Sequence, residues 1–267
     1  MIWIFEKLPT ARTVIVSIFW LQIVSAILVF WLAHENLIET RFGTQYMIEE
    51  IENSPSELKV RKYKKKVVPK LKQDDNQRPN VNLPSKITDN LKFSIVNIND
   101  LGKGMLLSGS IGEGDALRFI EFIKNSKDVD FEFVALQSPG GLVEEALIIG
   151  EEIRERELIT VLPGNSYCYS ACPYIMAGGT ERIFSAYSLL GVHQHYFSQN
   201  PIIPVFFAVQ TIQEGQAKTF RHLKKMGINT DIMEHILSTP PKEIYVLNTE
   251  ELERFKFATE IVKPLKK

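Results

Sequence analysis

The hydrophobic residues of this 267-residue chain first gather in one uninterrupted run near the N-terminus. Thr13–Ala33 contains no charged side chain, and as a helix it would cross a hydrocarbon layer about 30 Å thick. The run keeps bulky Phe30 and Trp31 close to its end, whereas a cleaved signal peptide ends in small residues. We therefore predict an uncleaved membrane anchor over residues 13–33, with a cleaved signal peptide as the alternative.

The charges on either side of this run predict its orientation. Lys7 and Arg12 precede it, and only Arg41 follows within twenty residues. Because positive charges favour the cytoplasmic side, residues 1–12 are expected to form a cytoplasmic tail. The bulk of the chain would then face the periplasm or the cell exterior.

Residues 34–91 are predicted to connect the anchor to a globular domain. The spacing of apolar residues over Glu35–Ile51 is helical and indicates an amphipathic or self-associating stalk. Lys59–Lys72 is strongly basic, and the stretch after it has two prolines and few large apolar residues, which predicts a solvated linker. Basic clusters also bind anionic lipid headgroups or nucleic acid. The net charge of -1 gives no general reason to expect nucleic-acid binding.

From residue 92 to residue 267, short apolar runs alternate with helical patterns, and two cysteines are too few for a disulfide-built scaffold. Strands are expected at Phe93–Ile98, Met105–Ser108, Phe131–Leu136, Leu158–Leu162, Arg182–Phe184, Leu189–Val192 and Thr259–Val262. Helices are expected at Asp115–Lys124, from Val143 to Ile153, around Pro204–Met226 and after a capping box that begins at Asn248. Strands separated by helices predict parallel crossover connections and an α/β fold.

The first candidate for chemistry is the turn Gln137-Ser138-Pro139-Gly140-Gly141, which lies between a predicted strand and a predicted helix. Without side chains at the two glycines, their backbone N–H groups can approach a ligand closely, and a helix N-terminus favours negative charge. Pro-Gly-Gly turns also occur for purely conformational reasons. The turn is therefore a candidate anion-binding element that needs a partner.

Ser170 is the candidate nucleophile. Pro173 is tolerated in a helix only within the first turn, so Ser170 is expected at a helix start with the N–H of Ala171 beside it. Serine is also a favoured N-cap for hydrogen-bonding reasons alone. Its hydroxyl becomes a good nucleophile only when a base activates it.

His193 is the natural general base, because it follows the predicted strand Leu189–Val192 and can return toward Ser170. His195 would lie on the same face if that strand continued, so the two histidines could instead ligate a metal. No carboxylate or cysteine at an obvious ligand spacing completes such a set. No metal or cofactor is therefore expected, and His222 and His235 are interpreted as ordinary helix residues.

These motifs, taken in order, resemble a known family. The SPGG turn, an amphipathic helix, a strand, the CYSAC motif around Ser170, the Ala177-Gly178-Gly179 turn and Gly191–Gln194 (GVHQ) resemble the Clp-type serine peptidases and, more distantly, signal peptide peptidase A. Both belong to the crotonase-like superfamily, and the likeness spans Phe93–Val262. It implies that residues 92–267 form a crotonase-like spiral of repeated β-β-α units that assembles into a homo-oligomer.

The resemblance also implies roles for individual residues. Ser170 would be the nucleophile and His193 the base, while the N–H groups of Gly141 and Ala171 would form the oxyanion hole. The family's acid position falls on Ile244, which cannot fill that role. Glu243 is the nearest carboxylate before the last helix, so it is the candidate for orienting His193.

The two cysteines, Cys168 and Cys172, bracket Ser170 and depart from the soluble members of the family. An outward-facing compartment would permit a disulfide between them. Two small buried thiols are the alternative. A cysteine nucleophile is a third interpretation, although neither thiol occupies the position that follows the family pattern.

The sequence thus predicts a membrane-anchored serine peptidase that cleaves polypeptides, membrane or exported proteins among them, through an acyl-enzyme. A catalytically silent crotonase-like domain that binds a partner or scaffolds an assembly at the membrane is the alternative, since the acid is missing from its family position. An acyl-CoA enzyme is more distant, because no nucleotide-binding motif is present.

Overall fold

The computed structural model describes residues 11–41, 60–63, 81–98, 101–195 and 205–262. The chain divides into two compact units, Met1–Tyr46 and Met47–Lys267, and each is described by itself. Most of the N-terminal tail predicted over residues 1–12, the end of the predicted stalk and residues 64–80 of the predicted linker lie outside the described residues.

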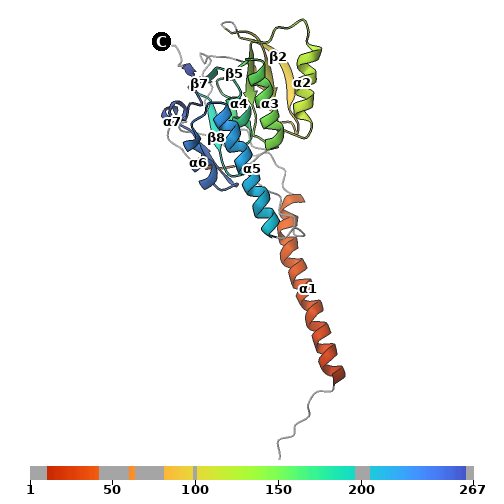
Figure 1. The fold of residues 1–267 in the computed structure, drawn as a ribbon. Coiled ribbons are helices and arrows are strands. Elements are labelled where there is room, and N and C mark those ends of the chain that lie inside the picture. Colours follow the sequence, from red (N-terminus) through yellow and green to blue (C-terminus); the bar gives the residue numbers. More distant parts are fainter. Residues whose placement is uncertain (1–10, 42–59, 64–80, 99–100, 196–204, 263–267) are drawn as a thin grey trace, which may run out of the picture. The chain divides into compact units, whose positions relative to one another are not determined.

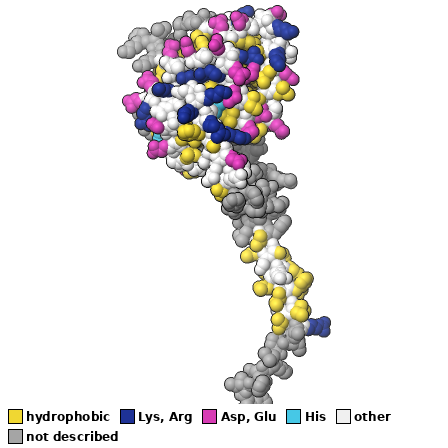
Figure 2. Space-filling view, in the orientation of Figure 1, with side chains coloured by type: hydrophobic (Ala, Val, Ile, Leu, Met, Phe, Trp, Pro, Cys, Tyr) yellow, Lys and Arg dark blue, Asp and Glu magenta, His cyan; other side chains and the backbone are white. Residues whose placement is uncertain are grey.

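The described residues of the first unit form the helix α1 (Ala11–Arg41). Its segment Arg12–Val29 has a mean hydropathy of 2.0 and none of it is buried, and Figure 2 shows hydrophobic side chains along it. Length and composition are those of a membrane-spanning helix. A signal anchor and a signal sequence both have these properties.

In the second unit, a six-stranded mixed sheet has the order β10-β7-β5-β4-β3-β2. Strand β2 pairs antiparallel with β3, and every other pair in this sheet is parallel. The parallel pairs agree with the predicted crossover connections. The six strands are β2 (Lys92–Ile98), β3 (Gly102–Ser108), β4 (Phe133–Gln137), β5 (Ile159–Leu162), β7 (Arg182–Ser185) and β10 (Glu260–Val262).

A second, four-stranded mixed sheet has the order β1-β9-β8-β6. It consists of β1 (Val60–Lys62), β9 (Glu243–Val246), β8 (Leu189–Val192) and β6 (Tyr167–Tyr169). Strands β6 and β8 are parallel, whereas β9 runs antiparallel to both of its neighbours. The chain moves from the larger sheet to the smaller one between β5 and β6 and again between β7 and β8. The molecule is therefore an α/β protein with two mixed sheets.

The helices α2 and α3 lie side by side over the larger sheet (Figure 1). Within the described part of the second unit, the helices are α2 (Asp115–Asn125), α3 (Val143–Glu155), α4 (Cys172–Ala177), α5 (Val205–Lys225), the 3-10 helix η1 (Thr230–Ile232), α6 (Met233–Ser238) and α7 (Thr249–Arg254). The capping box predicted at Asn248 is confirmed at the start of α7, where its side chain and that of Glu251 each accept from the other's backbone N–H.

Strand β4 shows how the larger sheet is buried on both faces. Val134 and Leu136 belong to the cluster that includes buried residues of α3, whereas Phe133 and Ala135 belong to a separate cluster on the opposite face. The three larger of these side chains each contribute about 1.5 to 3 kcal/mol to stability when fully buried. Burial on both faces explains why Phe133–Leu136 of β4 is a continuous apolar run instead of alternating.

Most predicted elements are confirmed within two residues of their ends, but three short strands, β1, β6 and β9, were not predicted. Strand β1 lies in the stretch that the composition assigned to a solvated linker, and it pairs with β9. Val81, from the same predicted linker, is buried. The linker predicted within residues 34–91 is thus partly built into the second unit.

Candidate active site

Ser170 and His193 meet because the strands that carry them are neighbours. Ser170 follows β6 and His193 follows β8, and β6 pairs with β8. The Ser170 N–H donates to the Gly191 carbonyl at 3.0 Å. The Ser170 Oγ then lies 2.7 Å from His193 Nε2. The predicted nucleophile and the predicted base are therefore in direct hydrogen-bonding contact.

The backbone of Ser170 adopts a left-handed conformation, with φ at 62°. A residue other than glycine pays roughly 1 to 2 kcal/mol in this region, and such strain concentrates at functional sites. A disulfide joins Cys168 to Cys172 across this residue, so the disulfide considered from the sequence is present in the structure. Both cysteines are buried, and together with the β6–β8 pairing they hold Ser170 in its conformation.

The tautomer of His193 follows from its second contact. Its Nδ1 lies 3.1 Å from the Pro241 carbonyl oxygen, which can only accept, so Nδ1 carries the proton. Nε2 is then the acceptor for the Ser170 hydroxyl. Burial lowers the pKa of His193, and the carbonyls of Pro241 and Pro240 act against that shift. A neutral imidazole with its Nε2 lone pair on a serine hydroxyl is a competent general base.

The Pro241 carbonyl, and not a carboxylate side chain, contacts His193 Nδ1. Glu243 begins β9, and within the described residues no hydrogen bond or ion pair joins its carboxylate to His193. Ile244 is buried, and its side chain packs closely against Gly191. The structure thus brings Ser170 and His193 together but does not bring Glu243 to them.

The glycine turn packs directly on the nucleophile. A Cβ added to Gly140 would lie 2.5 Å from the Ser170 Cβ and 2.8 Å from the Ala171 nitrogen. Gly140 also has φ at 94°, so both space and conformation require glycine there. The turn is also tied to β6, because the Ser138 N–H, just after β4, donates to the Tyr167 carbonyl at 2.9 Å.

Two backbone donors are left for a ligand at this point. The Gly140 carbonyl accepts from the Ile111 N–H at 2.9 Å, so the trans peptide directs the Gly141 N–H to the opposite side. In the part of the chain that the structure describes, neither the Gly141 N–H nor the Ala171 N–H donates to a protein acceptor. Free N–H groups beside a serine–histidine pair are suited to stabilising an oxyanion.

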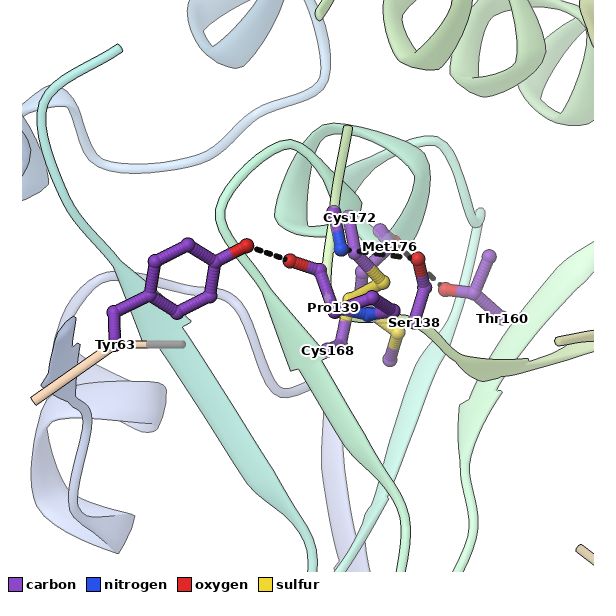
Figure 3. The surroundings of a disulfide bond; sticks show 8 residues. Tyr63, Ser138, Pro139, Thr160, Cys168, Cys172 and Met176 are labelled. Carbon is purple, nitrogen blue, oxygen red and sulfur yellow. Dashed lines mark hydrogen bonds between the residues drawn. A yellow bond between two sulfur atoms is a disulfide. The ribbon is translucent and has the colours of Figure 1, made fainter. Parts of the chain in front are cut away.

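Tyr63 is a site residue that the sequence did not reveal. Its hydroxyl donates to the Pro139 carbonyl at 2.5 Å, as Figure 3 shows, and its ring centroid lies 4.7 Å from that of His193. Burial raises the pKa of Tyr63 to about 12, and the nearby Ser170 side chain acts in the opposite direction. The one signal available was an aromatic residue inside a strongly basic stretch.

His195 has a different environment from His193. Its Nε2 lies 2.7 Å from the Tyr174 hydroxyl, and burial, aided by His193, lowers its pKa to about 4. His195 also lines a pocket of about 220 Å³ together with Gln194, Thr219 and Ile236. Across the described ranges, no group of three or more histidine, cysteine, aspartate or glutamate side chains could hold a metal ion.

Comparison with protein-family models finds no matching family, and no curated protein matches the chain. The function therefore has to be inferred from the residues of the site. Ser170, His193 and the glycine turn are the features that carry that inference.

Proposed function

We propose that this protein is a membrane-anchored serine peptidase that cleaves peptide bonds through an acyl-enzyme. The observation that carries the proposal is the 2.7 Å contact between Ser170 Oγ and His193 Nε2. The proposed oxyanion donors are the N–H groups of Gly141 and Ala171. The glycine turn packs on the end of β6, beside Ser170 and the Ala171 nitrogen, which supports this choice of donors.

In the proposed first step, Ser170 Oγ bonds to the carbonyl carbon of the scissile peptide while its proton passes to His193 Nε2. The electron pair of the carbonyl moves onto oxygen, where the two N–H groups stabilise it. Collapse of this intermediate breaks the C–N bond, and Nε2 returns the proton to the leaving amine. Water then attacks the acyl-enzyme with His193 again as base, which releases the acid and restores Ser170.

The order of elements supports a crotonase-like domain as part of this proposal. Twice the chain passes from a strand of the larger sheet to one of the smaller sheet and then to a helix, as β5-β6-α4 and as β7-β8-α5. This is the order expected for a spiral of β-β-α units. On this reading the protein is a homo-oligomer, and its substrates are polypeptides such as membrane or exported proteins.

The apolar helix α1 and the disulfide support the proposed location. A disulfide persists in the periplasm or outside the cell, where conditions are oxidising. We therefore place the catalytic domain on that side, with α1 as a single-pass anchor.

One observation favours a second candidate, a catalytically silent domain that binds a partner or scaffolds an assembly. His193 Nδ1 faces the neutral Pro241 carbonyl, and a neutral oxygen stabilises an imidazolium less than a carboxylate does. In this second candidate, the Ser170–His193 contact and the glycine turn stabilise the fold and do not catalyse a reaction.

The two candidates are separated by labelling the full-length chain in detergent with a serine-reactive fluorophosphonate. We expect labelling of the wild type and of Ser94→Ala, a control at an exposed position of β2. Ser170→Ala should abolish labelling, and His193→Ala should slow it by about 100- to 10,000-fold because the base is lost. Equal labelling of Ser170→Ala would contradict the proposal, and an unlabelled wild type would favour the silent domain.

A further inference from the structure

We infer that Tyr63 is a positioning residue of the Ser170–His193 pair, whose ring supports the imidazolium form of His193 and whose hydroxyl fixes the glycine turn. The catalytic part of the inference rests on the proposed function, because the imidazolium takes part in a reaction only if His193 accepts the Ser170 proton. Tyr63 comes from the segment that the sequence assigned to a linker. The proposed active site would therefore include a residue from outside the predicted globular domain.

The same short segment holds both the base and the tyrosine. The Pro241 carbonyl accepts from His193 Nδ1 at 3.1 Å, and the next carbonyl, that of Lys242, accepts from the Tyr63 N–H at 2.8 Å. Strand β1 continues this contact, with Lys62 opposite Glu243 in the antiparallel pairing with β9. The relative positions of Tyr63 and His193 are thus set by adjacent backbone groups.

The ring of Tyr63 is placed to interact with a positive charge on His193. Their centroids are 4.7 Å apart and the rings are tilted by 54°, within the distance of about 6 Å over which an aromatic ring attracts a cation. No carboxylate contacts this imidazole in the described part of the chain. The electron-rich ring therefore supplies part of the stabilisation that an acid supplies in a Ser-His-Asp triad.

The hydroxyl of Tyr63 acts on the other half of the site. It donates to the Pro139 carbonyl, one residue before Gly140, which packs on Ser170. Fixing the Pro139 carbonyl restrains the turn that presents the Gly141 N–H. Figure 3 shows this hydroxyl directed at Pro139, close to the Cys168–Cys172 disulfide that restrains Ser170.

The titratable groups that face His193 are Tyr63 from the β1 side and His195 farther along its own segment, and the hydroxyl of Ser170 faces it after β6. The remaining polar contacts come from the backbone carbonyls of Pro240 and Pro241. Burial lowers the pKa of His193, and a smaller side chain at position 63 would relieve burial and raise that pKa. A fall in the pKa when Tyr63 is replaced can therefore be assigned to loss of the ring, provided that the hydroxyl is tested separately.

The test compares Tyr63→Leu and Tyr63→Phe in the full-length chain in detergent, with Tyr187→Leu, in the turn between β7 and β8, as the control. Two quantities are measured: the rate constant of fluorophosphonate labelling as a function of pH, and the pKa of His193 by NMR. Tyr63→Leu should slow labelling by about 2- to 30-fold and lower the pKa of His193 by roughly 0.4 to 1.5 units. Tyr63→Phe should keep the pKa of His193 but slow labelling, because the turn is less restrained.

An unchanged or raised pKa of His193 in Tyr63→Leu would overturn the inference. Faster labelling of either Tyr63 variant would also overturn it, because Tyr63 would then cover the nucleophile instead of supporting it. An unlabelled wild type would overturn the proposed function alone, and the pKa measurement would still decide whether the ring stabilises the imidazolium.

Discussion

Ser170 has a strained left-handed backbone and lies between two buried residues. Its φ of 62° disfavours any residue with a Cβ, while Tyr169 and Ala171 on either side of it are buried. The disulfide and the hydrogen bond to Gly191 keep the conformation in place. The gain is a hydroxyl that projects toward His193 Nε2.

This strain can be measured without reference to catalysis. Ser170→Ala and Ser170→Gly both lack the hydroxyl, but only glycine is free of the steric cost of positive φ. We expect Ser170→Gly to be more stable than Ser170→Ala by roughly 0.5 to 1 kcal/mol, which corresponds to about 2 °C in melting temperature. Thermal unfolding of the two variants in the same detergent tests this. A lower melting temperature for Ser170→Gly would show that the site is not strained.

The sequence could predict which side chains carry the chemistry of the candidate site, but not which backbone groups contact them. Ser170 and His193 were predictable because their residue types and order carry the chemistry. The Pro241 carbonyl was not, since every residue has a carbonyl and only the tertiary fold places one at Nδ1. Tyr63 was missed for a related reason: its partner Pro139 is 76 residues away in sequence.

Among the elements, the glycine turn depends most on side-chain volume. A Cβ at Gly140 would lie 2.5 Å from both the Ser170 Cβ and the Tyr169 carbonyl oxygen. Neither atom can move easily, because Tyr169 belongs to β6, which is paired with β8 and bridged to the end of β4. The turn and the nucleophile strand therefore form one packed unit.

Gly140→Ala and Gly114→Ala separate close packing from conformational strain. Gly114 also has positive φ, 77°, but nothing lies within 4 Å of its added Cβ, so its replacement should cost about 1 kcal/mol. Gly140→Ala should cost about 1 to 3 kcal/mol more, because the new methyl group overpacks the site, and it should also abolish fluorophosphonate labelling. Chemical unfolding and labelling of both variants test this, and equal losses of stability would refute the close approach.

The three strands that the sequence did not predict are short and have no periodic pattern. Strand β6 has three residues, all buried, so alternation cannot be seen in it. Strand β1 lies among lysines, and its place is set by backbone pairing with β9. In contrast, the longer elements α2, α3, β2 and β4 have patterns long enough to be recognised, and the structure confirms them.

On the scale of the second unit, three histidines are held in surroundings that disfavour their charged form. His193 and His222 are buried, and His195 is partly buried. Burial is the main cause that lowers the pKa of each of them, to about 4 for His195. At neutral pH each is therefore uncharged in the folded chain.

These shifts predict that acid destabilises the fold before its carboxylates titrate. Unfolded histidines have a pKa of about 6.5, so below that pH the unfolded chain binds more protons than the folded chain, and stability falls as pH falls. The melting temperature should therefore decrease between pH 7 and pH 5, above the usual range of aspartate and glutamate. His195→Gln cannot take up the proton but can still bond to the Tyr174 hydroxyl, so its melting temperature should depend less on pH. A melting temperature that is constant over this range in the wild type, or equally pH-dependent in both chains, would contradict the assignment.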